Sequence, residues 1–192
     1  MSFFNSAYQG TPPWDIGRPQ GEFVALEESG TIEGDVLDVG CGTGENAMFL
    51  AGRGHRVTGV DTAALAISKA KAKAASRGVE VDFREWDALR IDKLEKRFDS
   101  VVDCGFFHTL SDSERRLFER SLYATVRPNG NYFMLVFSDE EPDWGGPRRI
   151  TKDEIRDTFS QGWQVRIIRE ARFEDHYHRD AGKAWLSTIQ RA

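Results

Sequence analysis

The chain has 192 residues, of which 40% are hydrophobic, and a formal net charge of −5. This length predicts one domain with a sizeable core over residues 1–192. The sequence has no apolar run of membrane-spanning length, no signal sequence and no long basic cluster. We therefore expect a cytoplasmic protein that binds neither a membrane nor nucleic acid. Its two cysteines argue against a disulfide framework and a structural zinc site, and we expect no metal. No feature of the sequence indicates the oligomeric state.

Residues 1–20 are rich in aromatic side chains and contain several prolines, which prevent a continuous helix. We expect an irregular segment that is ordered only if its aromatic side chains are buried. One interpretation is a lid over a ligand site, with Trp14 facing a cofactor and Arg18 facing a substrate. The alternative is a packed N-terminal arm or partial disorder. Residues 19–29 are expected to form a short helix that ends at Gly30.

A glycine-rich turn follows the first predicted strand, residues 35–39. Gly40, Gly42 and Gly44 stand at alternate positions, and a helix is expected to begin at Glu45. A strand, a glycine turn and a helix N-terminus in this order form a site for a cofactor, because the backbone can approach a ligand closely and unpaired N–H groups point outward. The dinucleotide fingerprint requires a third glycine where this chain has Glu45.

The pattern Asp-x-Gly-x-Gly-x-Gly, from Asp38 to Gly44, resembles the cofactor-binding motif of class I S-adenosylmethionine-dependent methyltransferases. The resemblance implies that Asp38 contacts or orients the amino group of the cofactor, directly or through water. It also implies that the glycines leave room for the methionine part and the ribose. The cofactor would be S-adenosyl-L-methionine, with S-adenosyl-L-homocysteine as product. A purely structural glycine turn is the alternative.

A second predicted strand, residues 56–60, ends on Asp61. An acidic side chain at this position can accept hydrogen bonds from both hydroxyls of a ribose, as in other nucleoside-binding α/β folds. The alternative is that Asp61 or Thr62 caps the next helix, residues 63–76. The two roles are compatible, because a helix cap and a ribose ligand can be neighbours.

The third predicted strand, residues 79–83, leads to Asp87 and Ala88. In the methyltransferases that this chain resembles, an acid followed by alanine after this strand binds the adenine. The resemblance therefore implies that Asp87 accepts a hydrogen bond from the exocyclic amine and that the Ala88 N–H faces the ring. An aspartate after a strand is common by itself, so the expected adenine contact depends on the spacing of Asp87 from Asp61.

The fourth predicted strand, residues 98–103, is followed by Cys104 and then by His108. His108 is the candidate general base, because it follows a strand end and its unperturbed pKa lies near neutral pH. The alternative is a histidine that packs or orients the substrate without accepting a proton. If the first and fourth strands are neighbours, Cys41 and Cys104 lie close beneath the cofactor, although small buried packing residues are the simpler interpretation.

Aromatic side chains in three segments are candidates for the substrate site. Phe107 and Trp144 would stack on a flat substrate, or would pack as part of a lid. His176 and Tyr177 lie in the loop before the last predicted strand, with His178 beside them. For His176 and His178, a solvent-exposed loop position is the alternative.

The second half of the chain continues the alternation of helices and strands. We expect a helix capped by Ser111 and Glu114, followed by a turn over residues 127–130 and a strand over 132–138. A helix from Thr151 to Phe159 is expected next, and then two strands, over 163–168 and 183–190. This alternation predicts a three-layer α/β sandwich with a doubly wound sheet, in which ligands bind beyond the carboxyl ends of the strands, at the point where the strand order reverses. The family resemblance implies a Rossmann-like sheet of seven strands in the order 3-2-1-4-5-7-6, with the seventh antiparallel.

Segments outside the glycine turn, among them residues 14–19, Phe106 to His108 and Trp185-Leu186, are similar to thiopurine, tellurite-resistance and heterocyclic-toxin methyltransferases. This resemblance implies methyl transfer to an oxygen, nitrogen or sulfur of a small aromatic or heterocyclic molecule. A non-catalytic protein that binds S-adenosylmethionine is one alternative. An NAD-dependent oxidoreductase is another, against which Asp38 and Glu45 argue.

Overall fold

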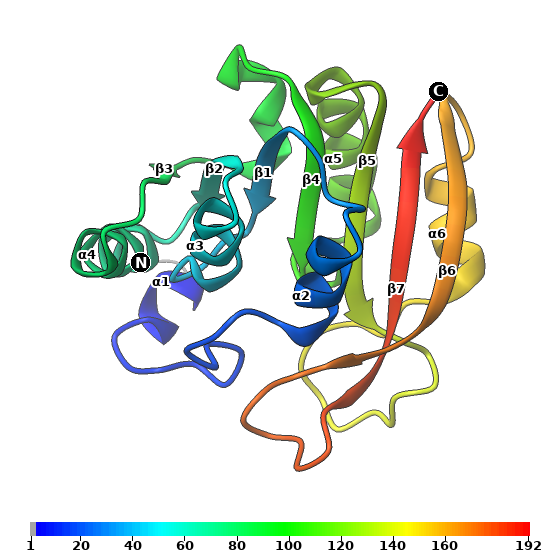
Figure 1. Ribbon diagram of the computed structural model, residues 1–192. Coiled ribbons are helices and arrows are strands. Elements are labelled where there is room, and N and C mark those ends of the chain that lie inside the picture. Colours follow the sequence, from blue (N-terminus) through cyan, green and yellow to red (C-terminus); the bar gives the residue numbers. More distant parts are fainter. Residues whose placement is uncertain (1–2) are drawn as a thin grey trace.

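The computed structural model describes residues 3–192, which form one seven-stranded sheet between two layers of helices (Figure 1). The strands are β1 (Asp35–Val39), β2 (Arg56–Asp61), β3 (Asp82–Glu85), β4 (Phe98–Cys104), β5 (Val126–Phe137), β6 (Trp163–Phe173) and β7 (Gly182–Arg191). The helices are α1 (Phe3–Ala7), α2 (Gly21–Glu28), α3 (Glu45–Gly52), α4 (Ala64–Arg77), α5 (Asp112–Thr125) and α6 (Lys152–Thr158), with short 3-10 helices η1 (Ala88–Leu94) and η2 (Phe107–Thr109).

The strand order is β3-β2-β1-β4-β5-β7-β6, which confirms the expected sheet. Strands β1 to β5 pair in parallel, whereas β7 pairs antiparallel with both β5 and β6. β1 lies between β2 and β4, so the strand order reverses there. The switch point predicted from the sequence is therefore confirmed, and the carboxyl ends of β1, β2 and β4 open on the same edge of the sheet.

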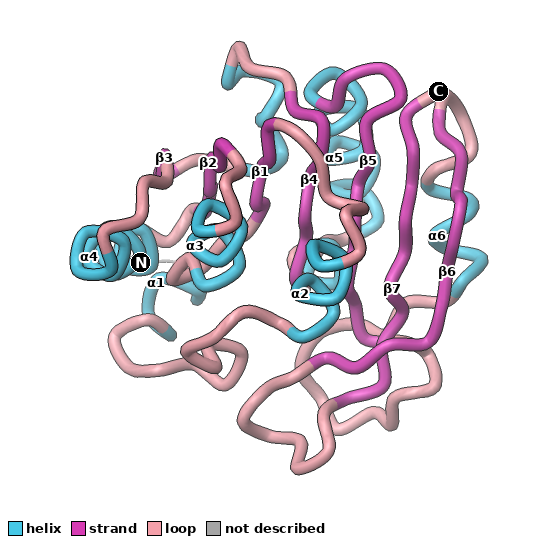
Figure 2. The backbone as a smooth tube through the Cα atoms, viewed as in Figure 1, coloured by secondary structure: helices cyan, strands magenta, loops and turns pink. Residues whose placement is uncertain are grey.

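Each face of the sheet carries its own hydrophobic core. Helices α5 and α6 cover one face, where Phe118 and Ile155 are fully buried. Helices α2, α3 and α4 cover the other, where Phe23 and Leu50 are fully buried (Figure 2). Burying one such side chain stabilises the fold by about 1.5–3 kcal/mol. The two cores hold the parallel strands rigidly, and with them the strand ends that carry the polar residues.

Several element bounds differ from the expected ones. Residues 3–7 are helical, because the prolines that break this segment come later in the chain. β3 begins at Asp82 rather than at Val79, whose N–H donates to the Ala74 carbonyl at the end of α4. The expectation for residues 1–20 also covers residues 1–2, which lie outside the described part of the chain.

In the C-terminal half, both β5 and β6 are longer than expected. β5 begins at Val126, which pairs with Phe98, and the expected turn persists as a register shift inside the strand, with Asn129 in the left-handed region at φ 65°. β6 runs to Phe173, which shortens the following loop to residues 174–181. Both predicted capping boxes are confirmed, at the N-termini of α5 and α6.

Three connections gather at the carboxyl-end edge of the sheet, at the lower end of Figure 1: residues 8–20, residues 139–150 and residues 174–181. The first and third are joined directly. Gln20 Nε2 donates to the Glu174 carbonyl (2.8 Å), and the Glu174 N–H donates to Gln20 Oε1 (3.0 Å). We call residues 3–20 the N-terminal arm, which is thus joined to the loop before β7; its closing over a ligand as a lid stays a prediction.

Within residues 3–192, no helix combines the length and the apolar character that crossing a bilayer requires. The cytoplasmic location, the single domain over residues 1–192 and the lack of nucleic-acid or membrane partners stay predictions.

Candidate active site

The glycine turn between β1 and α3 requires its glycines. Gly40, Gly42 and Gly44 all have positive φ, at 64°, 53° and 84°. A Cβ on Gly40 would lie 2.9 Å from the Cβ of Phe106, and one on Gly42 would lie 2.6 Å from the hydroxyl of Tyr8. Only a glycine adopts these angles at low cost and lets the neighbouring side chains approach so closely. The turn is therefore tightly packed against Phe106 and Tyr8, and of its three glycines Gly40 lines the cavity described below.

Asp38 is a buried acid with no basic partner among the described residues. It is 1% exposed; the Ala47 N–H approaches the carboxyl and acts to lower its pKa, but neither oxygen has a partner at hydrogen-bond geometry. Burial, and then the charge of Asp103, raise the pKa of Asp38 well above its usual value. A buried unpaired carboxylate is costly unless a cation or a donor completes it. The residue therefore fits the amino group of an amino-acid cofactor.

Asp61 at the end of β2 accepts hydrogen bonds from two backbone N–H groups, while Ala63, and neither Asp61 nor Thr62, is the N-cap residue of α4. Its Oδ2 accepts a hydrogen bond from the Gly42 N–H (2.9 Å), and its Oδ1 accepts one from the Ala63 N–H (2.8 Å), just before α4. The side chain also lines the cavity described below, together with the exposed Thr62. Each carboxylate oxygen has more than one acceptor site, so these two bonds leave Asp61 able to accept from ribose hydroxyls.

Asp87 is exposed and caps η1, where its Oδ1 accepts from the Leu89 N–H (2.9 Å). It does not line the cavity, whereas its neighbours Trp86 and Ala88 do. The capping bond occupies one oxygen only. The contact of Asp87 with adenine stays a prediction, and Trp86 is a cavity-lining residue that the sequence did not single out.

A cavity of about 1260 Å³ opens at the carboxyl ends of the strands. Sites for a single small ligand usually measure about 300–1,000 Å³, so this cavity has room for a cofactor and a second small molecule. Expected site residues that line it are Trp14, Gly40, Asp61, Thr62, Ala88, Cys104, His108, Trp144 and Tyr177. Expected residues that do not line it are Arg18, Asp38, Cys41, Gly42, Gly44, Asp87, Phe107 and His176.

One end of this cavity has mainly aromatic walls, and we call it the aromatic end: His108, Phe137, Trp144, Phe173 and His178. The rings of His108 and Phe137 stack with their centroids 5.2 Å apart and their planes 5° apart. The Phe137 ring is also 4.7 Å from Phe173 and 5.5 Å from Trp144. Trp144 in turn is 5.1 Å from His178. Flat aromatic walls favour a flat aromatic ligand.

The position of His108 opposes the general-base role expected for it. It is 4% exposed, and its Nδ1 accepts a hydrogen bond from the Phe137 N–H (3.2 Å). Burial, and then the charges of Arg149 and Arg115, lower the pKa of His108 to about 3. The ring is therefore neutral near pH 7, and its one proton is on Nε2. Nε2 lies on the side of Gly105, a cavity-lining residue. His108 offers the cavity a donor and no free lone pair.

Three expected substrate residues lie elsewhere. Arg18 is exposed and forms an ion pair with Glu174. Phe107 is fully buried in the core on the α5 face, and Phe106 lines the cavity instead. His176 is tied to the N-terminal arm, because its N–H donates to the Pro13 carbonyl (2.9 Å). These residues stay near the site, yet none of them lines the cavity.

The hydrogen bonds of Asp103 explain why Phe106, and not the expected Phe107, lines the cavity. The buried carboxylate of Asp103 accepts from the N–H groups of Phe106 (2.7 Å) and Phe107 (3.1 Å) and from the hydroxyl of Tyr132 (2.6 Å). These bonds hold the chain in the turn that begins η2 and direct Phe107 inward. An aspartate before Cys-Gly-Phe-Phe was visible in the sequence, but its partners were not.

The cavity also includes residues that sequence reasoning missed. Tyr8 and Phe4 come from the arm, Phe137 from the end of β5 and Phe173 from the end of β6. Aromatic composition was the available signal for the arm. Phe137 and Phe173 sit in apolar runs that read as ordinary strand interiors, so only the sheet order brings them to this edge.

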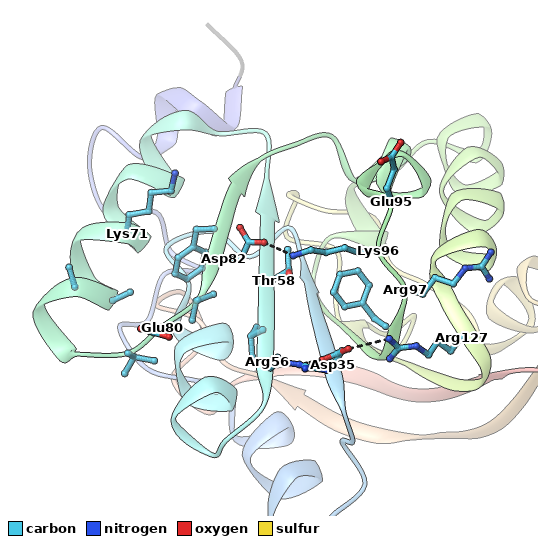
Figure 3. A pocket seen from close by; sticks show the side chains of 17 residues that line it. Asp35, Arg56, Thr58, Lys71, Glu80, Asp82, Glu95, Lys96, Arg97 and Arg127 are labelled. Atoms are coloured by element: carbon cyan, nitrogen blue, oxygen red, sulfur yellow. Dashed lines mark hydrogen bonds and ion pairs between the residues drawn. The ribbon is translucent and has the colours of Figure 1, made fainter.

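A second pocket, of about 860 Å³, lies at the opposite edge of the sheet, where the parallel strands begin (Figure 3). Both of its aspartates have basic partners. Asp35 pairs with Arg56 (2.6 Å) and Arg127 (3.2 Å), and Asp82 pairs with Lys96 (2.7 Å). Asp38, by contrast, has no basic partner among the described residues. Over residues 3–192, no group of three or more histidine, cysteine or acidic side chains is placed to hold a metal ion.

Comparison with known proteins gives concordant matches. A methyltransferase-domain family model matches residues 36–130. The 2-heptyl-1-hydroxyquinolin-4(1H)-one methyltransferase of Mycobacteroides abscessus is 38% identical over 183 residues, which are 90% of this chain and 81% of that protein. A solved structure from work on the conversion of a disulfide bond into a thioacetal group during echinomycin biosynthesis is 37% identical, with a TM-score of 0.88 over 98% of this chain and 91% of that one. TehB from Haemophilus influenzae, at 17% identity, shares the fold, with a TM-score of 0.72 over 98% of this chain and 65% of that one.

Proposed function

This chain belongs to the class I S-adenosylmethionine-dependent methyltransferases that act on small molecules, and we propose that its acceptor is a flat aromatic heterocycle that reacts in its ionised form. The family membership confirms the resemblance seen in the glycine motif, the cofactor and the methyltransferase activity. We propose the identity of the acceptor and the roles of single residues from the geometry of the site.

The residues at the glycine turn fit the cofactor. The buried carboxyl of Asp38, which has no basic partner among the described residues, suits the ammonium of the methionine part. Asp61 retains acceptor capacity for ribose hydroxyls, and Asp61, Gly40 and Trp14 line the cavity. When bound, the cofactor supplies a methyl group on a positively charged sulfur. The protein then contributes alignment of the nucleophile and exclusion of water.

The proposed class of acceptor is based on the aromatic end of the cavity. Its walls stack on one another around Phe137, at centroid distances of 4.7–5.5 Å to Phe173, His108 and Trp144. Such walls favour a flat ring over an alkyl chain or a sugar. The Mycobacteroides relative is named for a hydroxyl-bearing quinolinone, which is a flat heterocycle with an ionisable oxygen. That likeness supports the same class of acceptor here.

The proposed ionised acceptor follows from the two imidazoles at the aromatic end. His108 presents its Nε2–H and uses its lone pair on the Phe137 N–H. His178 has both ring nitrogens against carboxylates, those of Asp175 (2.8 Å) and Glu141 (3.0 Å). Neither ring is placed to remove a proton from an acceptor. A donor such as His108 instead stabilises an acceptor that already carries negative charge, because hydrogen bonds to charged groups are the stronger ones.

We expect hydroxyquinolines and related acidic heterocycles to be methylated in preference to aliphatic alcohols and amines. The test incubates the protein and methyl-labelled S-adenosylmethionine with matched acceptors, namely hydroxyquinolinones, phenols, aromatic thiols and aliphatic alcohols, and reads the label by mass spectrometry. Label in the acidic heterocycles alone supports the proposal. Transfer to aliphatic alcohols at equal or greater efficiency contradicts it.

A further inference from the structure

Two loops at the aromatic end meet at one buried carboxylate, that of Glu141. The residue is 7% exposed and lies in the connection between β5 and α6. Its Oε1 accepts from Trp144 Nε1 (2.9 Å) and lies 3.0 Å from His178 Nε2, and its Oε2 accepts from the Lys183 N–H (2.7 Å). These three partners come from its own loop, from the loop before β7 and from β7 itself. Glu141 thus joins its own loop to residues 178–183, which are far from it in the sequence.

His178 continues this network to a second carboxylate. Its Nδ1 lies 2.8 Å from Asp175 Oδ2, while Asp175 Oδ1 also accepts from the N–H groups of Tyr177 (2.7 Å) and His178 (2.8 Å). Both ring nitrogens of His178 therefore face carboxylate oxygens. Burial alone raises the pKa of Glu141, but the Lys183 N–H, the Trp144 indole and His178 together lower it. Both oxygens of the Glu141 carboxylate are therefore engaged.

The Glu141 network orients the side chain of Trp144, which its packing contacts cover only in part. Trp144 is 40% exposed, so solvent covers a large part of its ring. Its indole contacts Phe137, and across the loops it contacts Tyr177 at 6.1 Å and His178 at 5.1 Å between centroids. The Arg149 guanidinium lies over the face of the ring, 4.6 Å from its centroid, and the directional bond from Trp144 Nε1 to Glu141 holds the edge of the indole. The orientation of one wall of the aromatic end therefore depends on a carboxylate that does not itself line the cavity.

We propose that Glu141 is a positioning residue that holds Trp144 and His178 in place and so determines which acceptors fit the aromatic end. The proposal rests on the aromatic end being the acceptor site. Glu141 acts through the rings that it orients, and it touches neither the acceptor nor the cofactor. Its removal leaves the cofactor half of the cavity intact, because the glycine turn, Asp38 and Asp61 belong to other segments.

The test compares Glu141→Gln with Glu140→Gln, a change of the adjacent and exposed acid. In Glu141→Gln the new amide places N–H groups against donors that the carboxylate accepted, so at least one of the three bonds is lost. We expect the KM for a flat acceptor to rise about tenfold, equivalent to about 1.4 kcal/mol, with kcat and the Kd for S-adenosylmethionine within about twofold of the parent values. Glu140→Gln is expected to match the parent protein.

A double-variant comparison separates positioning from general loosening of the fold. Trp144→Phe keeps a ring at this position and removes the donor to Glu141. If Glu141 acts through Trp144, the KM of the double variant equals that of the worse single variant, since contacting residues in one network are not additive. Additive effects of the two changes, or a fall in kcat and cofactor affinity together with the rise in KM, would overturn the proposal.

Hydrogen exchange tests the same network without any acceptor. Glu141→Gln is expected to speed amide exchange in residues 139–150 and 174–183 together, while Glu140→Gln changes neither. If the parent protein methylates no heterocycle, the proposed function fails, and the exchange result still decides whether Glu141 joins the two loops. Unchanged exchange in both segments would overturn the positioning role, whatever the acceptor is.

Discussion

Replacing Asp38 by asparagine is expected to weaken S-adenosylmethionine binding by a hundredfold or more and, in the same protein, to raise the stability of the cofactor-free form. The loss follows because breaking a buried charge pair by removing one partner costs about 3–5 kcal/mol. The gain follows because Asp38 is 1% exposed and both its oxygens lack partners among the described residues. Calorimetric titration gives the affinity, and thermal unfolding without cofactor gives the stability.

The pH dependence of this gain has a definite sign. Burial raises the pKa of Asp38, so the folded chain holds this proton more tightly than the unfolded chain does. Stability without cofactor is therefore lost as pH rises above the unfolded pKa of about 3.9. The stabilising effect of Asp38→Asn is expected to grow in the same direction, because asparagine has no proton to lose.

A matched control lies at the start of the same strand. Asp35 pairs with Arg56 and Arg127 at the opposite edge of the sheet, and these partners lower its pKa. Asp35→Asn is therefore expected to leave cofactor affinity unchanged and to reduce stability slightly. An Asp38→Asn protein with the parent's affinity would remove Asp38 from the cofactor site.

Replacing His108 by leucine is expected to lower kcat/KM for an acidic heterocycle by about tenfold to a hundredfold, because the bound anion loses a hydrogen bond to a charged group, which is worth about 1.5–3 kcal/mol. His108→Gln is expected to retain much of the activity, because its side-chain amide can donate a hydrogen bond. Glutamine cannot accept a proton as a base does. Steady-state kinetics with one acceptor and all three proteins give the comparison.

The ratio between the two variants decides the role of His108. Equal and severe losses in His108→Gln and His108→Leu would restore the general-base interpretation. Equal and full activity in both would remove His108 from the reaction altogether. The Kd for S-adenosylmethionine is the control, and it is expected to stay near the parent value in both variants.

The sequence was sufficient for most of the fold. The apolar run before Gly40 and the alternation of elements locate the parallel strands, and the capping boxes at Ser111 and Thr151 locate two helix starts. These signals are local, since each depends on a few neighbouring residues. The predicted element bounds were wrong where a strand distant in the sequence determines them. An example is β5, whose first residue pairs with Phe98 across a register shift.

The site was harder to predict, for the same reason. The glycine turn and Asp61 were visible because strand ends of a parallel sheet share an edge. The state of His108 depends on a backbone N–H at Phe137, which lies in another strand, so no spacing reveals that its lone pair is used. Glu141 carries no motif at all, and its importance arises only when the loops that hold Trp144 and His178 come together.

The pH dependence of kcat/KM for two hydroxy-heterocycles of the same shape but different acidity distinguishes an ionised acceptor from a general base of the enzyme. Burial lowers the pKa of His108 to about 3 and its Nδ1 accepts from the Phe137 N–H, so we expect the acceptor itself to supply the ionisation. The pH of half-maximal kcat/KM is then expected to follow the pKa of each acceptor. One midpoint common to both acceptors would show that an ionisable group of the enzyme controls the reaction and would rule out the proposed ionised acceptor.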